Sequence, residues 1–356
     1  MPHSQRDPWK RLLHNKGALC GALIIIACSF MAVFAYFISP DSSPDANRII
    51  VEIGGQKPGY SQQFLKLPKK NNIAKQSFFE ILINGKKDRF DFIPITNYTW
   101  RADSLIASKY IDEGVAERIS YLKKSIPGAE IANQYFALGT DKFGRDILSR
   151  LIVGVRVSLG VGLVTVLLSV LIGVSLGAVA GYFQGRVDDL IMWLINVVWS
   201  IPTLLLVFAV TLVLGKGFWQ VFIAIGLTTW VNVARLIRGQ VMGIRKLEYI
   251  EAARALGYTD ARIILRHILP NVTGPVTVIA AANFATAIVI EAGLSFLGVG
   301  VQPPQPSWGL MIKENYNFII THNPMLALAP GFAIMLLVLA FNLLGNGLRD
   351  ALQVKE

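Results

Sequence analysis

Long runs without a charged residue dominate the pattern of hydrophobic and polar positions along this chain. A helix needs about 20 mainly apolar residues to cross the hydrocarbon core of a bilayer. Uncharged runs that approach or exceed this length occupy residues 17–38, 157–185, 190–215, 217–234, 268–290 and 323–348. So many long runs predict six transmembrane helices, and they disfavour the alternative of buried helices in a large soluble protein.

The first run could instead belong to a cleaved signal peptide, because a basic segment precedes it. Its 22 uncharged residues exceed the apolar core of about 7–15 residues that signal peptides carry. The following sequence, ISPDSS, also lacks a small-residue cleavage site of the A-x-A kind. We therefore expect a retained helix. Its cysteines, Cys20 and Cys28, lie about 12 Å apart along such a helix, too far for a disulfide.

Composition agrees with a membrane protein, since 53% of the residues are hydrophobic and only 16% are charged. The net charge of +11 is concentrated partly in two short segments, residues 1–16 and 235–266. Short basic loops stay on the cytoplasmic side, and six spans then place both termini there. The expected division is a cytoplasmic N-terminus (1–16), a first transmembrane helix (17–39), an external insertion (40–136), a five-helix core (137–352) with an inner loop (235–267), and a cytoplasmic tail (353–356).

The external segment differs from the rest of the chain and predicts a small α/β domain. RIIVEI at residues 48–53 has the composition of a strand, and residues 77–95 suggest a hairpin that turns at Asn84-Gly85. Residues 104–125 are expected to form a helix. We find no cluster of metal ligands and no nucleophile constellation in this segment.

Residues 141–156, DKFGRDILSRLIVGVR, precede the second predicted span. Their apolar residues fall on one helical face, with Arg145 and Arg150 off that face. The pattern predicts a helix on the membrane surface, and the alternative is a continuation of the outer domain.

Within the second run, Gly173, Gly177 and Gly181 recur every four residues, a spacing that lets helices approach closely. The letters GVSLG also match a hydrolase nucleophile pattern, but that pattern needs a strand–turn–helix context. Pro202, Pro275 and Pro330 interrupt three spans and permit kinks there.

The charged stretch at residues 248–270, EYIEAARALGYTDARIILRHILP, predicts two short helices. Gly257 can adopt the left-handed conformation that ends the first helix. Thr259 suits the N-cap of the second, with Asp260 in its first turn, and Pro270 either closes this helix or begins the next span. Three interpretations compete: a merely basic inner loop, a nucleic-acid-binding helix-turn-helix, and a docking element for a cytoplasmic partner. Because both ends are tethered to spans, no nucleic acid is expected as a partner.

This stretch resembles the EAA loop of the permeases of ATP-binding-cassette (ABC) importers, through Glu251-Ala252-Ala253, Gly257 and Leu269-Pro270. His267 occupies a position that is usually aliphatic in that pattern. Further segments resemble the C-type permease subunit of dipeptide and oligopeptide importers over residues 137–352 and the first span. They include LGTDKFGRDILSRLIVGVRVSLG, GYFQGRVDD, SIPTLLL, EAGLSFLGVGVQPPQPSWG and NLLGNGLRDAL. Residues 40–136 have no counterpart in this resemblance.

The resemblance implies an all-α membrane protein with the type I, MetI-like permease architecture, located in a bacterial inner membrane. It implies as partners a homologous B-type permease, two ABC ATPases, an external solute-binding protein and the lipid bilayer. ATP and Mg²⁺ would bind to the ATPases, because this chain has no phosphate-binding loop pattern and is expected to hold no cofactor and no metal. Coupling to the ATPases would depend on Glu248, Glu251, Ala252, Ala253, Arg254, Gly257, Leu269 and Pro270.

Polar residues inside the spans are the candidates for a solute pathway. They are Asn196, Asn232, Asn283 and Glu291, although buried amides also join helices and a carboxylate near an interface can simply face water. The alternative functions are a secondary transporter or channel that works without ATP, and a receptor acting through the outer segment. We see no internal repeat of the kind that favours a secondary transporter.

Overall fold

The computed structural model describes residues 8–69, 76–215, 217–320 and 323–352. The expected tail, residues 353–356, and the first seven residues of the expected N-terminus lie outside the described residues. The chain forms two compact units. We call Met1–Cys28, Ser158–Gln302 and Ile334–Glu356 the helical unit, and Ser29–Val157 and Pro303–Ala333 the sheet unit.

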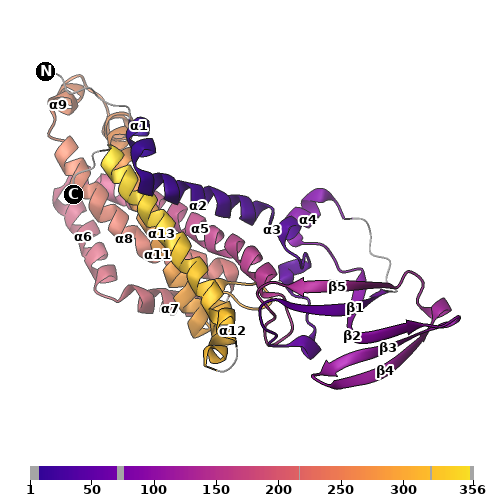
Figure 1. Ribbon diagram of the computed structural model, residues 1–356. Helices are drawn as coiled ribbons and strands as arrows, with labels where there is room; N and C mark the ends of the chain where they lie inside the picture. The colour runs from indigo at the N-terminus through magenta and orange to yellow at the C-terminus, as the bar shows by residue number, and fades with distance from the viewer. Residues whose placement is uncertain (1–7, 70–75, 216, 321–322, 353–356) are drawn as a thin grey trace. The chain divides into compact units, whose positions relative to one another are not determined.

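Helices account for most of the described chain (Figure 1). The α-helices are α1 (Pro8–His14), α2 (Lys16–Val33), α3 (Ala35–Ile38), α4 (Phe78–Asn84), α5 (Ile147–Phe183), α6 (Gly185–Trp199), α7 (Thr203–Leu214), α8 (Phe218–Ile244), α9 (Glu248–Ala255), α10 (Asp260–Ile263), α11 (Thr273–Leu297), α12 (Trp308–Asn315) and α13 (Met325–Leu352). The strands are β1 (Tyr60–Pro68), β2 (Phe90–Trp100), β3 (Ser104–Asp112), β4 (Val115–Leu122) and β5 (Glu130–Phe136).

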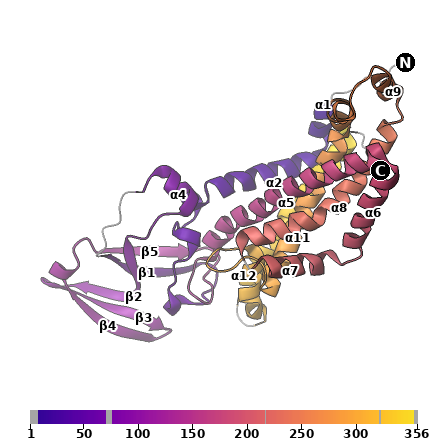
Figure 2. The same ribbon diagram turned by 180° about the vertical axis from the view of Figure 1, so that it is seen from behind.

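Among the described residues, five helices are long and apolar enough to cross a membrane, or six if one bent pair counts as a single span. The five are Lys16–Val33, Ile147–Phe183, Phe218–Ile244, Asp260–Leu297 and Met325–Leu352. The bent pair is α6 and α7, which meet at 91° and occupy the third predicted span (Figure 2). Pro202, which lacks a backbone N–H and disfavours a helical residue before it, lies at this break. The prediction of a helical membrane protein is confirmed, with five spans, or six if α6 and α7 together form one broken span.

Close packing of α5 against α8 holds the helical unit together. A Cβ atom on Gly177 would lie 2.5 Å from the carbonyl oxygen of Ala234, and one on Gly181 would lie 2.7 Å from that of Arg238. Gly173 makes the same approach to Trp230 one turn earlier, at 2.7 Å. Only glycine therefore allows these two helix backbones to lie so close, as the spacing of the three glycines predicts.

The helix α8 is longer than the uncharged run that predicts it, which ends at Ala234. It continues to Ile244, and its two arginines, Arg235 and Arg238, form hydrogen bonds with side chains of α6. Arg238 donates two hydrogen bonds, of 2.5 and 2.6 Å, to the carboxylate of Asp188. These two arginines therefore belong to α8, and the loop that follows begins only after Ile244.

The prediction of a separate surface helix at residues 141–156 is wrong. A turn with one isolated bridge, between Thr140 and Asp146, precedes α5, and α5 then runs without a break from Ile147 to Phe183. Arg145 and Arg150 do not face solvent, since only 3% and 1% of their surfaces are exposed.

The insertion folds as a five-stranded antiparallel sheet in the order β4-β3-β2-β1-β5 (Figure 1). The helix expected at residues 104–125 is wrong, because this segment forms the hairpin of β3 and β4. Its buried residues Leu105 and Ala107 alternate with less buried ones, which is the period of a strand. Gly114, with a φ of +75°, makes the turn between the two strands.

Two further local predictions in the insertion differ from the structure. RIIVEI forms a short 3-10 helix at Val51–Ile53 and not a strand. The expected hairpin at Asn84-Gly85 is instead the C-terminal end of α4, where Gly85 has a φ of +80° and its N–H bonds to the carbonyl of Ile81. The α/β composition of the insertion therefore stands, with its elements in other places.

The sheet buries apolar residues on both faces, because successive side chains on a strand point to opposite sides. Phe64 on β1 packs with Ile50, Ile53 and Phe136. Its neighbour Leu65 belongs to a second cluster, with Ile95, Leu105 and Ala107. Residues from outside the strands thus cover each face: the Val51–Ile53 turn covers one, and the segment that contains Ile126 and Ala129 covers the other.

Candidate functional site

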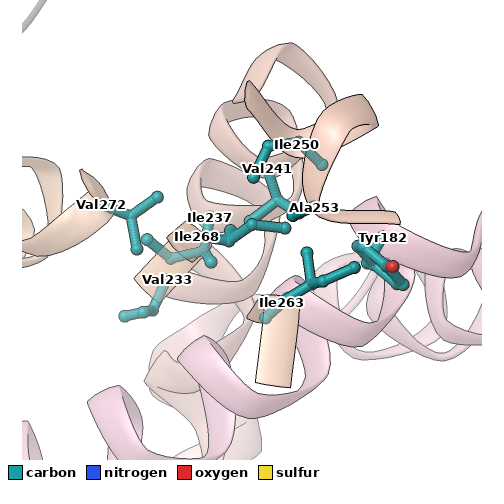
Figure 3. Packing of buried hydrophobic residues seen from close by; sticks show 10 residues of the cluster. Tyr182, Val233, Ile237, Val241, Ile250, Ala253, Ile263, Ile268 and Val272 are labelled. Atoms are coloured by element: carbon teal, nitrogen blue, oxygen red, sulfur yellow. The ribbon is translucent and has the colours of Figure 1, made fainter. Parts of the chain in front are cut away.

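The short helix α9 presents one apolar face to the helical unit and exposes the rest of its surface. Ile250 and Ala253 are buried in a cluster with Val241 of α8 and Ile263 of α10 (Figure 3). The exposed residues include four of the predicted site residues, Glu248, Glu251, Ala252 and Arg254. Large apolar side chains lie beside them: Leu247, Tyr249 and Leu256 are 46%, 43% and 74% exposed. The buried face therefore holds α9 against the helical unit, and its exposed face carries both apolar and charged side chains.

The end of α9 has the hydrogen bonds of a Schellman motif. The N–H of Tyr258 donates to the carbonyl of Ala253 at 3.2 Å, and that of Gly257 donates to the carbonyl of Arg254 at 3.0 Å. Gly257 has a φ of +77°, so the predicted left-handed conformation is confirmed. The chain turns sharply at this glycine and begins α10 three residues later.

The start of α10 also agrees with its sequence. The hydroxyl oxygen of Thr259 accepts a hydrogen bond from the N–H of Arg262 at 3.4 Å, as the N-cap prediction requires. Asp260, in the first turn, accepts a hydrogen bond of 2.5 Å from the hydroxyl of Tyr182. The ring of Tyr182 lies 5.7 Å from the guanidinium groups of both Arg245 and Arg254. Tyr182 thus connects α5 with the two helices of the loop.

Leu269 and Pro270 form a 3-10 turn that leads into α11. A wider π-helical turn, Ile264–Ile268, precedes it, since proline offers no N–H to continue the regular helix. Pro270 therefore begins the next span and does not close α10. His267 stacks on the ring of Tyr258, with the ring centroids 5.9 Å apart, so this unusual position packs against the residue that follows Gly257.

The four polar candidates within the spans fall into two pairs. Asn283 and Glu291 are buried, at 5% and 1% exposure. The amide of Asn283 donates to the hydroxyl oxygen of Ser169 on α5 at 3.4 Å. Glu291 accepts a hydrogen bond of 2.6 Å from Ser295, whose hydroxyl oxygen accepts the N–H of Val301 at 3.0 Å. Asn283 thus connects α11 to α5, whereas the bond of Glu291 lies within α11, at the serine that holds the segment after this helix.

Asn196 and Asn232 are exposed, on α6 and α8 respectively. The side-chain oxygen of Asn196 accepts a hydrogen bond of 3.2 Å from Arg235. The guanidinium of Arg235 also lies 3.6 Å from the ring centroid of Trp199. The structure therefore does not bring the four candidates together in one place.

A buried ion cluster in the sheet unit was not predicted. Arg145 donates 2.6 Å and 2.7 Å hydrogen bonds to the carboxylates of Asp141 and Glu314, and Arg150 lies 3.8 Å from Glu314. Nearby, burial raises the pKa of Asp146, and hydrogen bonds from Ser149 oppose this shift. The sequence shows the two arginines next to an apolar run. Their shared partner, Glu314, lies 169 positions after Arg145, so no local pattern connects them.

The described residues contain no group of three or more histidine, cysteine or acidic side chains that could hold a metal ion. The site is the exposed surface of α9, which rests on a buried apolar core shared with the neighbouring helices. The core beneath α9 includes Val241 of α8 and Val272, which directly precedes α11 (Figure 3). A protein that binds α9 can therefore transmit a displacement to α8 and α11.

Comparisons with known proteins agree with this architecture. A family model described as "Binding-protein-dependent transport system inner membrane component" matches residues 173–355. A second, "N-terminal TM domain of oligopeptide transport permease C", matches residues 6–57.

Two curated relatives have nearly the same degree of identity. The glutathione transport system permease protein GsiD of Pectobacterium atrosepticum is 43% identical over 218 residues, which are 61% of this chain and 72% of that protein. The dipeptide transport system permease protein DppC of Alkalihalophilus pseudofirmus is 43% identical over 217 residues, 61% of this chain and 71% of that protein.

Among solved structures, a chain of the MetNI methionine ABC transporter in an inward-facing conformation is similar, with 19% identity and a TM-score of 0.49, over 59% of this chain and 98% of that one. The family matches confirm the resemblance to ABC importer permeases that the motifs indicate. The chain belongs to the family of inner-membrane components of binding-protein-dependent transport systems, as a multi-pass, non-catalytic permease subunit.

Proposed function

We propose that this permease forms half of the translocation pathway of an ATP-driven importer for small peptides, such as dipeptides or glutathione. The support for this substrate class is the 43% identity to permeases named for glutathione and dipeptide transport. The partners would be a homologous B-type permease, two cytoplasmic ABC ATPases and an external solute-binding protein. ATP and Mg²⁺ would be bound by the ATPases.

The observation that carries the coupling role is the two-sided character of α9. Its buried face, Ile250 and Ala253, is part of the same core as α8 and the start of α11. Its other face exposes Glu251, Ala252 and Leu256. A partner that binds the exposed face and moves would therefore displace α9 together with the spans beneath it.

This proposal fixes the orientation of the chain. The loop with α9 and α10 would face the cytoplasm, where the ATPases are, and both termini would lie on the same side. Arg245, Lys246, Arg254, Arg262 and Arg266 in this loop support that side, because short cytoplasmic loops are rich in lysine and arginine. The insertion at residues 40–136 would then be external.

The four polar residues divide under this proposal. Asn196 and Asn232, which are exposed, would be available to the solute or to the second permease. Asn283 would hold α11 against α5 through Ser169, and Glu291 would keep its bond to Ser295 within α11.

The test is a pull-down of the tagged chain from detergent-solubilised membranes, with mass spectrometry of the captured proteins, and uptake of labelled dipeptide and glutathione with and without ATP depletion. We expect a second permease and one or two ATPases in the pull-down, and uptake that stops without ATP. Capture of the chain alone, with uptake that continues after ATP depletion, would favour a secondary transporter or channel.

A further inference from the structure

The short helix α4 is almost entirely apolar, yet none of its residues is buried. Phe78, Phe79 and Ile83 are 56%, 71% and 61% exposed. The two polar residues of the helix, Glu80 and Asn84, are four positions apart and therefore share one narrow polar face. This is the pattern of an amphipathic helix whose apolar face is largely uncovered by the described chain.

This apolar face continues the exposed surface at the end of the first span. The ring of Phe37 on α3 stacks on the ring of Phe78, with centroids 5.1 Å apart. Phe37 and Ile38 are themselves 46% and 43% exposed, and Phe30 and Val33 on α2 are 59% and 49% exposed. A span meets lipid along part of its length. The helix α4 contacts α3, which directly follows this span (Figure 1).

Hydrogen bonds hold α4 firmly at this place. The guanidinium of Arg156 donates to the carbonyls of Leu82 and Ile83 at 3.0 and 3.1 Å, and so caps the C-terminal end of the helix. The side chain of Gln76 joins the two ends of the α4 segment. It donates to the carbonyl of Gly85 at 3.1 Å and accepts the N–H of Lys87 at 2.8 Å.

The residues around α4 are those that favour the boundary between lipid and water. Arg156 lies 5.0 Å from the ring of Tyr36, and aromatic and basic side chains together are enriched at this depth. Lys86 and Lys87 follow Gly85 and are exposed. The ammonium group of Lys87 lies 3.6 Å from the Glu80 carboxylate, and that of Lys86 can reach lipid phosphates.

From this arrangement we propose that α4 lies in the membrane–water interface at the end of the first span, with Phe78, Phe79 and Ile83 among the lipid acyl chains. The helix would anchor the sheet insertion to the bilayer surface. The inference does not depend on which solute is transported or on the coupling role of α9, since it rests on residues of the sheet unit alone.

Site-directed spin labelling of the full-length chain in phosphatidylcholine–phosphatidylglycerol vesicles tests the proposal. Cys20 and Cys28 are first replaced by alanine, and Phe79→Cys carries the label. Collision with oxygen, which concentrates in lipid, is compared with collision with a nickel(II) chelate, which stays in water. Two matched positions calibrate the result: Phe30→Cys on the first span, at 59% exposure, and Leu122→Cys on β4, at 65% exposure.

We expect the ratio of oxygen to nickel accessibility at Phe79 to be several-fold higher than at Leu122 and to approach the ratio at Phe30. A ratio equal to that of Leu122 would overturn the proposal, because the helix would then lie in water. Low accessibility to both reagents would also overturn it, in favour of a protein that covers α4. The Ile83→Cys label, one turn further on the same helix, provides the same test if the Phe79 variant does not fold.

Discussion

The hydroxyl of Tyr182, near the end of α5, donates a 2.5 Å hydrogen bond to the carboxylate of Asp260 at the start of α10. The ring of Tyr182 is 3% exposed and lies in the same core as Ile250 and Ala253 of α9. One side chain therefore fixes the loop both by packing and by a directed hydrogen bond. The consequence is that removal of the hydroxyl alone separates the two contributions.

Tyr182→Phe should loosen α10 without disturbing the core. The ring remains in place, and the lost hydrogen bond to a carboxylate costs about 1 kcal/mol, which corresponds to about five-fold faster opening. Hydrogen–deuterium exchange of residues 258–264 measures this change. The control is Tyr249→Phe, which removes an exposed hydroxyl that accepts a 3.3 Å hydrogen bond from Asn271. Equal exchange in the two variants would show that the bond to Asp260 contributes nothing.

Reversal of the charge at Glu251 should abolish ATP-driven uptake while the permease still reaches the membrane. Glu251 lies on the exposed face of α9, so no core contact is lost when it changes to lysine. A basic group of an ATPase that pairs with this carboxylate would instead meet a like charge, which disfavours the complex. Uptake, membrane abundance and ATPase capture are measured together.

The control for this variant is Glu113→Lys, the same charge reversal at an exposed residue next to the β3–β4 turn. It should leave ATPase capture unchanged. Normal uptake by Glu251→Lys would argue against the coupling role of α9.

Gly257→Val tests backbone conformation separately from packing. A Cβ atom at this position would meet no atom within 4 Å, so a substitution produces no clash. The φ of +77° is nevertheless unfavourable for a β-branched residue, at a cost of about 1–2 kcal/mol. We expect reduced uptake with normal membrane insertion. Gly257→Asn should retain most activity, because asparagine tolerates this conformation. An equal loss of uptake in both variants would show that position 257 must lack a side chain, and that the left-handed turn alone is not sufficient.

The sequence predicts the spans well because each depends on a local property, the length of an uncharged run. The loop of α9 and α10 is also well predicted, since Gly257 and Thr259 act on their immediate neighbours through the Schellman motif and the N-cap. Pro202 indicates a break, but the 91° angle depends on the packing of α6 and α7 and could not be predicted.

The insertion shows where local patterns fail. Asn84-Gly85 is typical of a hairpin turn, yet a glycine with positive φ equally ends a helix, and here it ends α4. The interfacial amphipathic helix that residues 141–156 predict is absent there, whereas α4, which the sequence did not predict, exposes Phe78, Phe79 and Ile83. The burial of Arg145 and Arg150 depends on Glu314, which no local pattern connects to them.

Gly177→Val should destabilise the helical unit. The added Cβ would lie 2.5 Å from the carbonyl oxygen of Ala234, an atom of the backbone that cannot rotate away. The helices α5 and α8 must then separate, and overpacking of this kind costs about 1–3 kcal/mol. A lower midpoint of thermal unfolding in detergent is the expected result. Gly239→Val is the matched control, because Gly239 lies in α8 with no atom within 4 Å of its added Cβ. Equal midpoints for the two variants would contradict the close approach of α5 and α8.

Glu314→Gln should destabilise the sheet unit strongly. Glu314 is the shared partner of Arg145, at 2.7 Å, and Arg150, at 3.8 Å, and both guanidinium groups are at least 97% buried. Removing one partner of a buried ion pair costs about 3–5 kcal/mol. Arg145 keeps the carboxylate of Asp141 at 2.6 Å, so the loss falls mainly on Arg150, which pairs with Glu314. The control, Lys313→Gln, changes an exposed neighbour on α12 and should stay within about 0.5 kcal/mol.

The double variant Arg145→Gln with Glu314→Gln then distinguishes an ion pair from simple packing. If the two groups act on each other, the loss in the double variant is smaller than the sum of the two single losses, by an amount that a double-mutant cycle measures. Strictly additive losses would show that Arg145 and Glu314 stabilise the N-terminal end of α5 independently, and the buried cluster would then be an assembly of separate contacts.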